Sequence, residues 1–324
     1  MKNICIVGYG AIGPVHAAAI LKTENARLYA VCDIREERIK KCTEAYDVIS
    51  YDSFDEALCD KNIHCVHICT PHHMHFEMVK KALAAGKDVV VEKPATRTKE
   101  EFDELLELGN SHKVCVVLQN RYNPCMQTLR KIVKSGEMGE VKALKGILTW
   151  NRDSEYYSQD EWRGKEETEG GGVLINQAIH TLDYFGYAVC DVDTVRAQMT
   201  NFSVEEIEVE DTLCAYLTLK NGIKGVFFAT NAYGEDSNPE FEVLLEKGTL
   251  LYCGGKLYKN GAVIEEDSKP ELGKSCWGQG HEALFRKYYD GGEFFSLQYA
   301  KNTMHTVFAI YESAKNGSVV KNVE

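Results

Sequence analysis

Three polar residues, Lys93, Asn176 and His180, have the types and positions needed to act on an alcohol. Lys93 follows a short apolar run and precedes a proline, and four residues separate Asn176 from His180, which places both on one helix face. Oxidising a secondary alcohol requires a base within about 3 Å of the hydroxyl and a group that stabilises the developing alkoxide. An imidazole can accept such a proton, an ammonium can supply such a charge, and the Asn176 amide can hydrogen-bond a hydroxyl through either end. Each residue also has a structural alternative: Lys93 as a solvated lysine, His180 as a core histidine and Asn176 as a hydrogen-bonding group on the helix face.

A glycine-rich turn near the N-terminus is typical of a dinucleotide site. It has the spacing GxGxxG, lies between an apolar run at 2–7 and a helical pattern from 14, and is followed by an acid after the next apolar run. The glycines allow a tight turn, a close approach of the backbone to a pyrophosphate and close helix packing, and the acid accepts from a ribose hydroxyl. The predicted cofactor contacts here are Gly8, Gly10, Ala11, Ile12, Gly13, Asp33 and Arg35. A purely structural glycine turn is the alternative.

The residues after the second strand bear on the choice of cofactor. A carboxylate at Asp33 repels a 2′-phosphate, so NAD is expected. Arg35, two residues later, could attract that phosphate, so NADP stays open.

The first 120 residues alternate between strand and helix patterns. This alternation predicts a doubly wound parallel sheet, in which ligands gather beyond the carboxyl ends of the strands. The predicted strands are 2–7, 27–32, 48–49, 65–70, 88–91 and 114–118, and the predicted helices are 14–21, 36–45, 53–58, 76–85 and 99–110.

After about residue 121 the pattern changes to strands joined by hairpin turns such as Asn221-Gly222 and Asn260-Gly261. The chain is therefore predicted to be α/β, with a Rossmann domain at 1–120 and an α+β domain with an open, mostly antiparallel sheet at 121–324. The predicted strands are 141–150, 194–204, 211–220, 223–231, 241–246, 249–253 and 256–259, and the predicted helices are 280–289 and 297–316. An open sheet with an apolar face predicts a homodimer or homotetramer.

Composition excludes several other functions. The 324 residues carry 37 basic and 49 acidic side chains, a net charge of −12, so a nucleic-acid partner is not expected. No apolar run approaches the roughly 20 residues of a membrane span. The 12 cysteines are scattered without a CxxC pair, and the N-terminus enters a strand without a signal peptide, so a cytoplasmic protein with reduced thiols is expected. Five histidines lie within 64–75, but no acid or cysteine completes a tetrahedral set, so no metal is predicted.

Four segments together resemble the glucose–fructose oxidoreductase, inositol dehydrogenase and MocA family. They are the GYGAIG turn with its acid, the TPHHMH…ALAAGK…EKP stretch at 70–94, the GGGVLINQAIHTLD stretch at 170–183 and the AIYESAKNG stretch at 309–317. The second and third resemble the most specific motifs of the family, TPxxxH…ALxAGKxVxxEKP and GGGxLxDxGxHxxD.

The resemblance implies NAD(P)-linked oxidation or reduction of a sugar, nucleotide sugar or cyclitol. It implies that Lys93 orients the hydroxyl, that His180 exchanges its proton, and that Glu92 contacts Lys93 or the nicotinamide ribose. It also implies that the helix at 297–316 packs back on the Rossmann domain. Further expected cofactor contacts are Thr70, Pro71, His72, His75, Glu92, Lys93, Arg121, Trp162 and Arg163, and expected substrate contacts are Lys93, Tyr122, Tyr156, Asn176 and His180. Arg121 has an alternative as half of a surface ion pair, and Asp183 is expected to be structural.

Asn176 departs from the family, in which aspartate is commoner. An amide cannot be an anionic base, so His180 is the sole evident base and the substrate stays open. Two other functions stay open, of which Asn176 supports only the second. One is a glycosidase or lyase that uses NAD transiently without net redox change, and the other is a catalytically silent NAD-binding protein.

Overall fold

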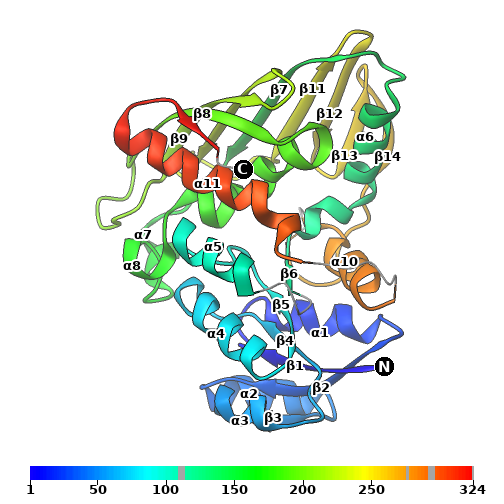
Figure 1. Cartoon of the computed structure of the whole chain (residues 1–324), viewed down its shortest axis with the longest axis vertical. Coiled ribbons are helices and arrows are strands. Elements are labelled where there is room, and N and C mark those ends of the chain that lie inside the picture. The colour runs from blue at the N-terminus through cyan, green and yellow to red at the C-terminus, as the bar shows by residue number, and fades with distance from the viewer. Residues whose placement is uncertain (109–113, 275–276, 291–295, 323–324) are drawn as a thin grey trace. The chain divides into compact units, whose positions relative to one another are not determined.

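The computed structural model describes residues 1–108, 114–274, 277–290 and 296–322, and the chain divides into two compact units (Figure 1). The first unit comprises Met1–Gln119 and Pro270–Ala300, and the second comprises Asn120–Lys269 and Lys301–Glu324. The first division lies beside the predicted boundary, and the C-terminal part of the chain contributes a segment to each unit. Cys276 and the predicted helix end at Asn110 lie outside the described residues.

In the described part of the first unit, six parallel strands form a sheet in the order β3-β2-β1-β4-β5-β6. The central strands are short apolar runs whose residues are buried on both faces, which is typical of a parallel sheet covered by helices. The strands are β1 (Lys2–Val7), β2 (Ala26–Cys32), β3 (Ile49–Tyr51), β4 (Cys65–Ile68), β5 (Asp88–Val91) and β6 (Val114–Val116). The doubly wound sheet expected from the sequence is confirmed.

Six α-helices of the described residues belong to this unit: α1 (Gly13–Leu21), α2 (Glu36–Ala45), α3 (Phe54–Cys59), α4 (His72–Ala84), α5 (Lys99–Leu108) and α10 (Gly280–Tyr289). Helix α4 begins at His72, four residues before the predicted helix at 76–85, so the predicted start is wrong and His72, His73 and His75 lie in the helix. The extended backbone of Pro71 at the N-cap starts the helix. Helix α10 packs on α1, with the Phe285 ring edge-on to the His16 ring at a centroid distance of 5.0 Å.

The second unit contains, within the described residues, a nine-stranded sheet in the order β14-β13-β12-β11-β7-β10-β9-β8-β15. Strands β7 and β10 pair in parallel and the other described neighbours pair antiparallel, so the sheet is mixed but mostly antiparallel, as predicted. The strands are β7 (Val141–Thr149), β8 (Val192–Thr200), β9 (Thr212–Leu219), β10 (Lys224–Thr230), β11 (Glu240–Leu245), β12 (Gly248–Cys253), β13 (Lys256–Lys259), β14 (Ala262–Glu266) and β15 (Val320–Lys321).

The α-helices of this unit are α6 (Pro124–Ser135), α7 (Ser154–Ser158), α8 (Glu166–Glu169), α9 (Ile179–Tyr184) and α11 (Gln298–Asn316), the last of which begins in the first unit. Helix α6 was not among the predicted elements. Pro124 in its first turn and Gly136 at its left-handed C-cap bound it, and its buried residues recur with helical spacing. Those buried residues are Cys125, Met126, Leu129 and Ile132.

The predicted packing of the last helix on the Rossmann domain stays a prediction. Most of α11, from Lys301 onward, belongs to the second unit. There the Tyr311 hydroxyl donates to Glu210 at 3.1 Å and the Ser313 hydroxyl accepts from the Ala197 backbone at 3.0 Å. The first unit also contains the C-terminal segment 270–300, which includes α10.

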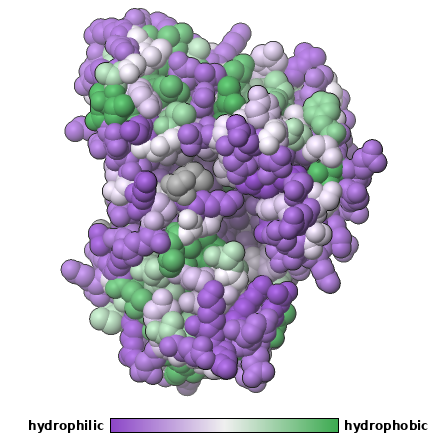
Figure 2. All heavy atoms as spheres, turned by 180° about the vertical axis from the view of Figure 1, so that it is seen from behind, coloured by the Kyte–Doolittle hydropathy of each residue, from purple (hydrophilic) through white to green (hydrophobic). Residues whose placement is uncertain are grey.

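Hydrophilic residues cover most of the face shown in Figure 2, with apolar residues in separate patches. No helix in the described ranges has the length and apolar character needed to cross a membrane. The eleven cysteines that the structure describes are free thiols, and most of them are buried.

Candidate active site

The glycine-rich turn has the geometry of a dinucleotide cradle. Gly8 has a φ of +91°, and a Cβ there would lie 2.7 Å from the Cys69 carbonyl oxygen. A Cβ at Gly13 would lie 2.8 Å from the Gly8 carbonyl oxygen, where α1 begins. Because no larger residue fits these two positions, the backbone N–H groups at the start of α1 stay accessible to an anion. Ala11 and Ile12, between the glycines, are exposed and half-buried respectively.

Asp33 lies beside this turn, in a position to read a ribose. Its Oδ2 accepts from the Tyr9 backbone N–H at 2.6 Å, and its Oδ1 accepts from the Arg35 backbone N–H at 3.0 Å. The guanidinium beside the carboxylate is that of Arg38, whose Nη1 lies 3.7 Å from Asp33 Oδ2 and 3.4 Å from an added Cβ at Gly10. Sequence reasoning missed Arg38, although its place in the first turn of α2 was a usable signal.

The Asp33→Ser variant is expected to bind NADH about tenfold more weakly and NADPH more tightly, because it loses a charge-assisted acceptor and the repulsion of a 2′-phosphate. Fluorescence titration with both cofactors measures this. Asp47→Ser, on an exposed residue of the same unit, is the control and should change neither affinity. Parallel losses for NADH and NADPH would contradict a discriminating role for Asp33.

The loops after β4 and β5 are tied together by a histidine. His75 is fully buried, with Nδ1 2.7 Å from the Pro94 carbonyl and Nε2 2.8 Å from the Thr70 carbonyl. Burial lowers the pKa of His75, so the ring is neutral and donates to one of these carbonyls at a time. His75 therefore supports the loops. His72 is also buried, whereas Thr70 and Pro71 are half-buried.

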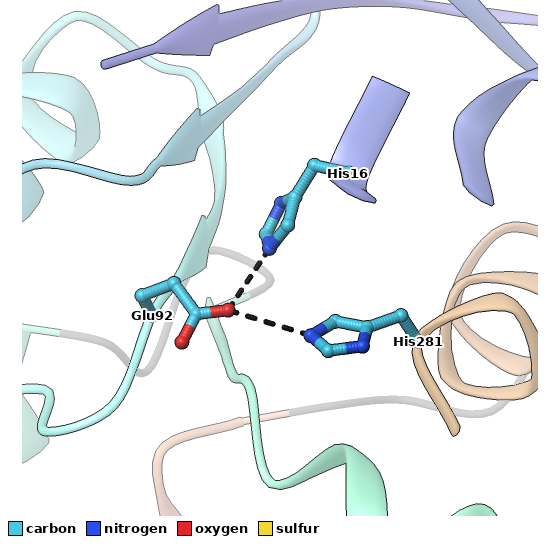
Figure 3. Close-up of side chains that lie close together, drawn as sticks. All are labelled: His16, Glu92 and His281. Carbon is cyan, nitrogen blue, oxygen red and sulfur yellow. Dashed lines mark hydrogen bonds and ion pairs between the residues drawn. The ribbon is translucent and has the colours of Figure 1, made fainter. Parts of the chain in front are cut away.

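The Glu92 carboxylate, at the end of β5, lies within a cluster of histidines (Figure 3). Its Oε1 is 2.9 Å from His16 Nε2 and 3.7 Å from His281 Nε2, and its Oε2 accepts from the Lys93 backbone N–H at 3.2 Å. Burial by itself would raise the pKa of Glu92, but the two histidines outweigh burial and hold that pKa well below its usual range. The carboxylate is thus ionised and fixes the main chain at Lys93.

Two histidines and a carboxylate are a donor set that zinc can use. The three side chains are His16, Glu92 and His281, and their donor atoms lie within 4.8 Å of one another. His16 Nε2 lies within hydrogen-bond distance of Glu92, whereas the buried His281 Nε2 has no hydrogen-bond partner among the described residues. Of the histidines at 64–75, His67 adjoins the set, with Nδ1 2.9 Å from His16 Nδ1.

In the second unit, Asn176 and His180 stand on one continuous helical segment. It begins as a π-helical turn over Leu174–Ala178 and continues as α9, a wider turn of a kind frequent at functional sites. Glu210 anchors its start, because its carboxylate accepts from the backbone N–H groups of Gly172 at 2.9 Å and Leu174 at 3.0 Å. His180 is buried and Asn176 is half-buried.

An aromatic and cationic stack flanks this segment. The Tyr156 hydroxyl accepts from Gln177 Nε2 at 3.0 Å and also contacts the Arg163 guanidinium. That guanidinium lies 4.5 Å from the Tyr156 ring centroid and 4.8 Å from that of Trp162. Three predicted contacts, Tyr156, Trp162 and Arg163, are thus brought together.

Arg121 is half of an ion pair, as in the alternative reading, but this pair is buried. Its Nε and Nη2 donate to Asp183 at 2.7 and 2.5 Å, and the Thr303 hydroxyl also donates to Asp183. The Arg121 guanidinium lies 5.2 Å from the Tyr187 ring centroid. Asp183, expected to be structural, is buried between Arg121 and Thr303, and Tyr122 is half-buried.

Sequence reasoning missed four polar residues of these two sites, namely His16, Arg38, Glu169 and His281. Glu169, the residue before the triple glycine, is fully buried and accepts from Asn176 Nδ2. Its place directly before a recognised motif was a usable signal. His281 had none, because its partners are distant in sequence.

The chain is similar to oxidoreductases over most of its length. Residues 2–120 match an oxidoreductase family with an NAD-binding Rossmann fold, and residues 126–251 match a GFO/IDH/MocA C-terminal domain. The uncharacterized oxidoreductase YrbE of Bacillus subtilis is 30% identical over 72% of this chain and 69% of its own length. The myo-inositol 2-dehydrogenase of Thermotoga maritima is 28% identical over 77% of this chain and 74% of its own.

Solved structures share the fold. The WlbA dehydrogenase from Bordetella pertussis, in complex with NADH and UDP-GlcNAcA, has a TM-score of 0.89 and 25% identity, covering 99% of this chain and 97% of that one. A levoglucosan dehydrogenase in complex with NADH and levoglucosan has a TM-score of 0.86 at 21% identity, covering both chains completely.

Proposed function

The chain belongs to the Gfo/Idh/MocA family of NAD-binding oxidoreductases, and from this premise we propose that it oxidises a secondary alcohol of a sugar, nucleotide sugar or cyclitol, or reduces the corresponding ketone. The observation that carries the proposal is the end of β5, where the buried, ionised Glu92 fixes the main chain at Lys93 in the same sheet that presents the glycine cradle.

The cradle fits NAD, since Gly8 and Gly13 leave no room for a Cβ and Asp33 supplies an acceptor for a ribose hydroxyl. Bound NAD supplies the hydride acceptor for the substrate carbon. The Lys93 ammonium orients the substrate hydroxyl and stabilises the alkoxide, and His180 takes the hydroxyl proton. Asn176 hydrogen-bonds a substrate hydroxyl, while Tyr156 and Tyr122 contact the sugar.

The substrate class rests on the relatives. WlbA, at 25% identity, is described with UDP-GlcNAcA, and the inositol dehydrogenase acts on a cyclitol. A nucleotide sugar carries negative charge, and the Arg163 guanidinium, which also pairs with Asp160 at 3.0 Å, supplies a cation beside Tyr156. We therefore rank nucleotide-linked sugars first.

The test is a screen of UDP-GlcNAcA, levoglucosan and myo-inositol with NAD and NADP, read by the absorbance of the reduced cofactor. Reduced cofactor is expected with at least one sugar or cyclitol, and more of it with NAD. Sugar consumption without net cofactor reduction would overturn the dehydrogenase assignment, and so would inactivity across a wider panel of sugars and cyclitols.

The second-unit sheet supports a homo-oligomer. Tyr216 on β9 is 64% exposed and lies opposite Val226 on β10, which is 43% exposed, and Leu244 on β11 is 44% exposed. Apolar side chains at exposed strand positions are covered when a second copy packs on the sheet.

The free cysteines support a cytoplasmic location.

A further inference from the structure

A buried carboxylate, that of Glu169, lies next to Asn176, the position at which the family more commonly has aspartate. Glu169 has no exposed surface, and its Oε1 accepts from Asn176 Nδ2 at 2.5 Å. Its Oε2 accepts from the Gly164 backbone N–H at 2.5 Å. Two donors thus satisfy the two oxygens of one carboxylate in the interior of the second unit.

This contact decides which end of the Asn176 amide faces Glu169. While Glu169 is ionised it only accepts hydrogen bonds, so the NH₂ group faces it, as the structure shows, and the carbonyl oxygen faces elsewhere. Asn176 stands four residues before His180 on the same helical segment. A substrate hydroxyl held at His180 would therefore meet an acceptor at Asn176.

We propose that Glu169 is a positioning residue that turns the carbonyl oxygen of Asn176 toward the substrate, so that the site prefers the hydroxyl form of its sugar. The proposal rests on the function proposed above. In this arrangement Glu169 carries the negative charge that an aspartate at position 176 would have carried. That charge acts on the substrate through the Asn176 amide.

Protonation of Glu169 reverses the arrangement, because a carboxylic acid donates a hydrogen bond and the amide then presents its oxygen to Glu169. Burial raises the pKa of Glu169 to about 7, against the lowering effects of Gly164 N–H, Asn176 and the nearby Arg163. Glu210 raises this pKa further. The other titratable groups whose charges interact with Glu169 are Tyr156 and Tyr157 on α7 and Tyr311 on α11.

The first test is the Glu169→Gln variant, with Glu166→Gln on the exposed side of α8 as the matched control. Loss of a fixed acceptor is expected to raise KM for the alcohol about tenfold, with a smaller change in kcat and no change in NADH affinity. The wild-type dependence of KM on pH near 7 should disappear in Glu169→Gln and persist in the control. An unchanged KM and pH profile would overturn the proposal.

A charge exchange separates positioning from packing. Asn176→Asp alone sets two carboxyl groups side by side, which raises the pKa of one of them and should lower activity at neutral pH. Adding Glu169→Gln restores an amide–carboxylate pair in the opposite order, and activity should recover. A double variant no better than Asn176→Asp would contradict the proposed pairing.

A readout without turnover keeps this proposal distinct from the enzyme assignment. The side-chain amide NMR signal of Asn176, assigned by its absence in Asn176→Ala, should titrate near pH 7 in the wild type and not in Glu169→Gln. If no substrate is found but the amide titrates, the pairing stands and the proposed reaction fails. An amide signal that does not move with pH overturns the pairing.

Discussion

The Lys93→Ala and His180→Ala variants are each expected to lower kcat by about 10²–10⁴-fold, with a far smaller change in NADH affinity. Lys93→Ala removes the cation beside the alkoxide, and His180→Ala removes the proton acceptor. The two residues also differ in what they depend on. The main chain at Lys93 is held by Glu92, whereas His180 is held by the helical segment that Glu210 anchors.

Steady-state kinetics on the substrate identified by the screen measures these losses, and NADH fluorescence measures cofactor affinity. Lys99→Ala, on helix α5, is the lysine control and should retain full turnover. Full turnover in both Lys93→Ala and His180→Ala on a genuine substrate would remove these residues from the mechanism.

The Asp183→Ala variant is expected to lose about 3–5 kcal/mol of unfolding free energy, because it leaves the Arg121 guanidinium buried without its anion. Arg121 is 8% exposed and Asp183 is 2% exposed, so water cannot replace the lost partner. Urea unfolding measures the change.

Two comparisons sharpen this stability test. Asp191→Ala removes an ion pair with Lys220 at 3.8 Å between half-exposed side chains, and it should cost less than about 1 kcal/mol. Replacing both partners, as Arg121→Met with Asp183→Leu, should recover much of the stability. A loss for Asp183→Ala no larger than that for Asp191→Ala would show that the buried pair is not a structural anchor.

Stability should also depend on pH through Glu169. Its pKa is raised from an ordinary 4.5 to about 7 in the folded protein, so the folded state holds a proton that the unfolded state has released. Its favourable contribution is complete below pH 4.5 and is lost as pH rises to about 7. Relative to Glu169→Gln, wild-type thermal stability should therefore fall across this interval.

The parts of the fold that could be predicted were those that have a local sequence pattern. The GxGxxG turn and the apolar strands around it predicted the parallel sheet, and hairpin turns such as Asn221-Gly222 predicted antiparallel pairing. The first turn of α4 was missed because three histidines obscured its helical pattern, although Pro71 marked its start. Helix α6 was missed although Pro124 and Gly136 bound it.

Two placements followed from spacing alone: Asp33 lies beside the glycine-rich turn, and Asn176 lies on one helical segment with His180. The site was less predictable where a residue acts through a distant partner. Nothing in the sequence near Glu92 indicates His281, and nothing near Arg121 indicates that Asp183 neutralises it. Such pairs arise from tertiary packing. Glu92 and His281 are 189 positions apart in the sequence, and Arg121 and Asp183 are 62 positions apart.

The division of the first unit into two sequence segments has a consequence for biosynthesis. A ribosome completes Met1–Gln119 long before it makes Pro270–Ala300, so β1, β4 and β5 exist for a time without α10. During that interval His16, His67 and Glu92 lack the cover of Phe285 and the partner His281. The first unit can therefore complete its fold only after most of the second unit has been synthesised, although the first unit begins the chain.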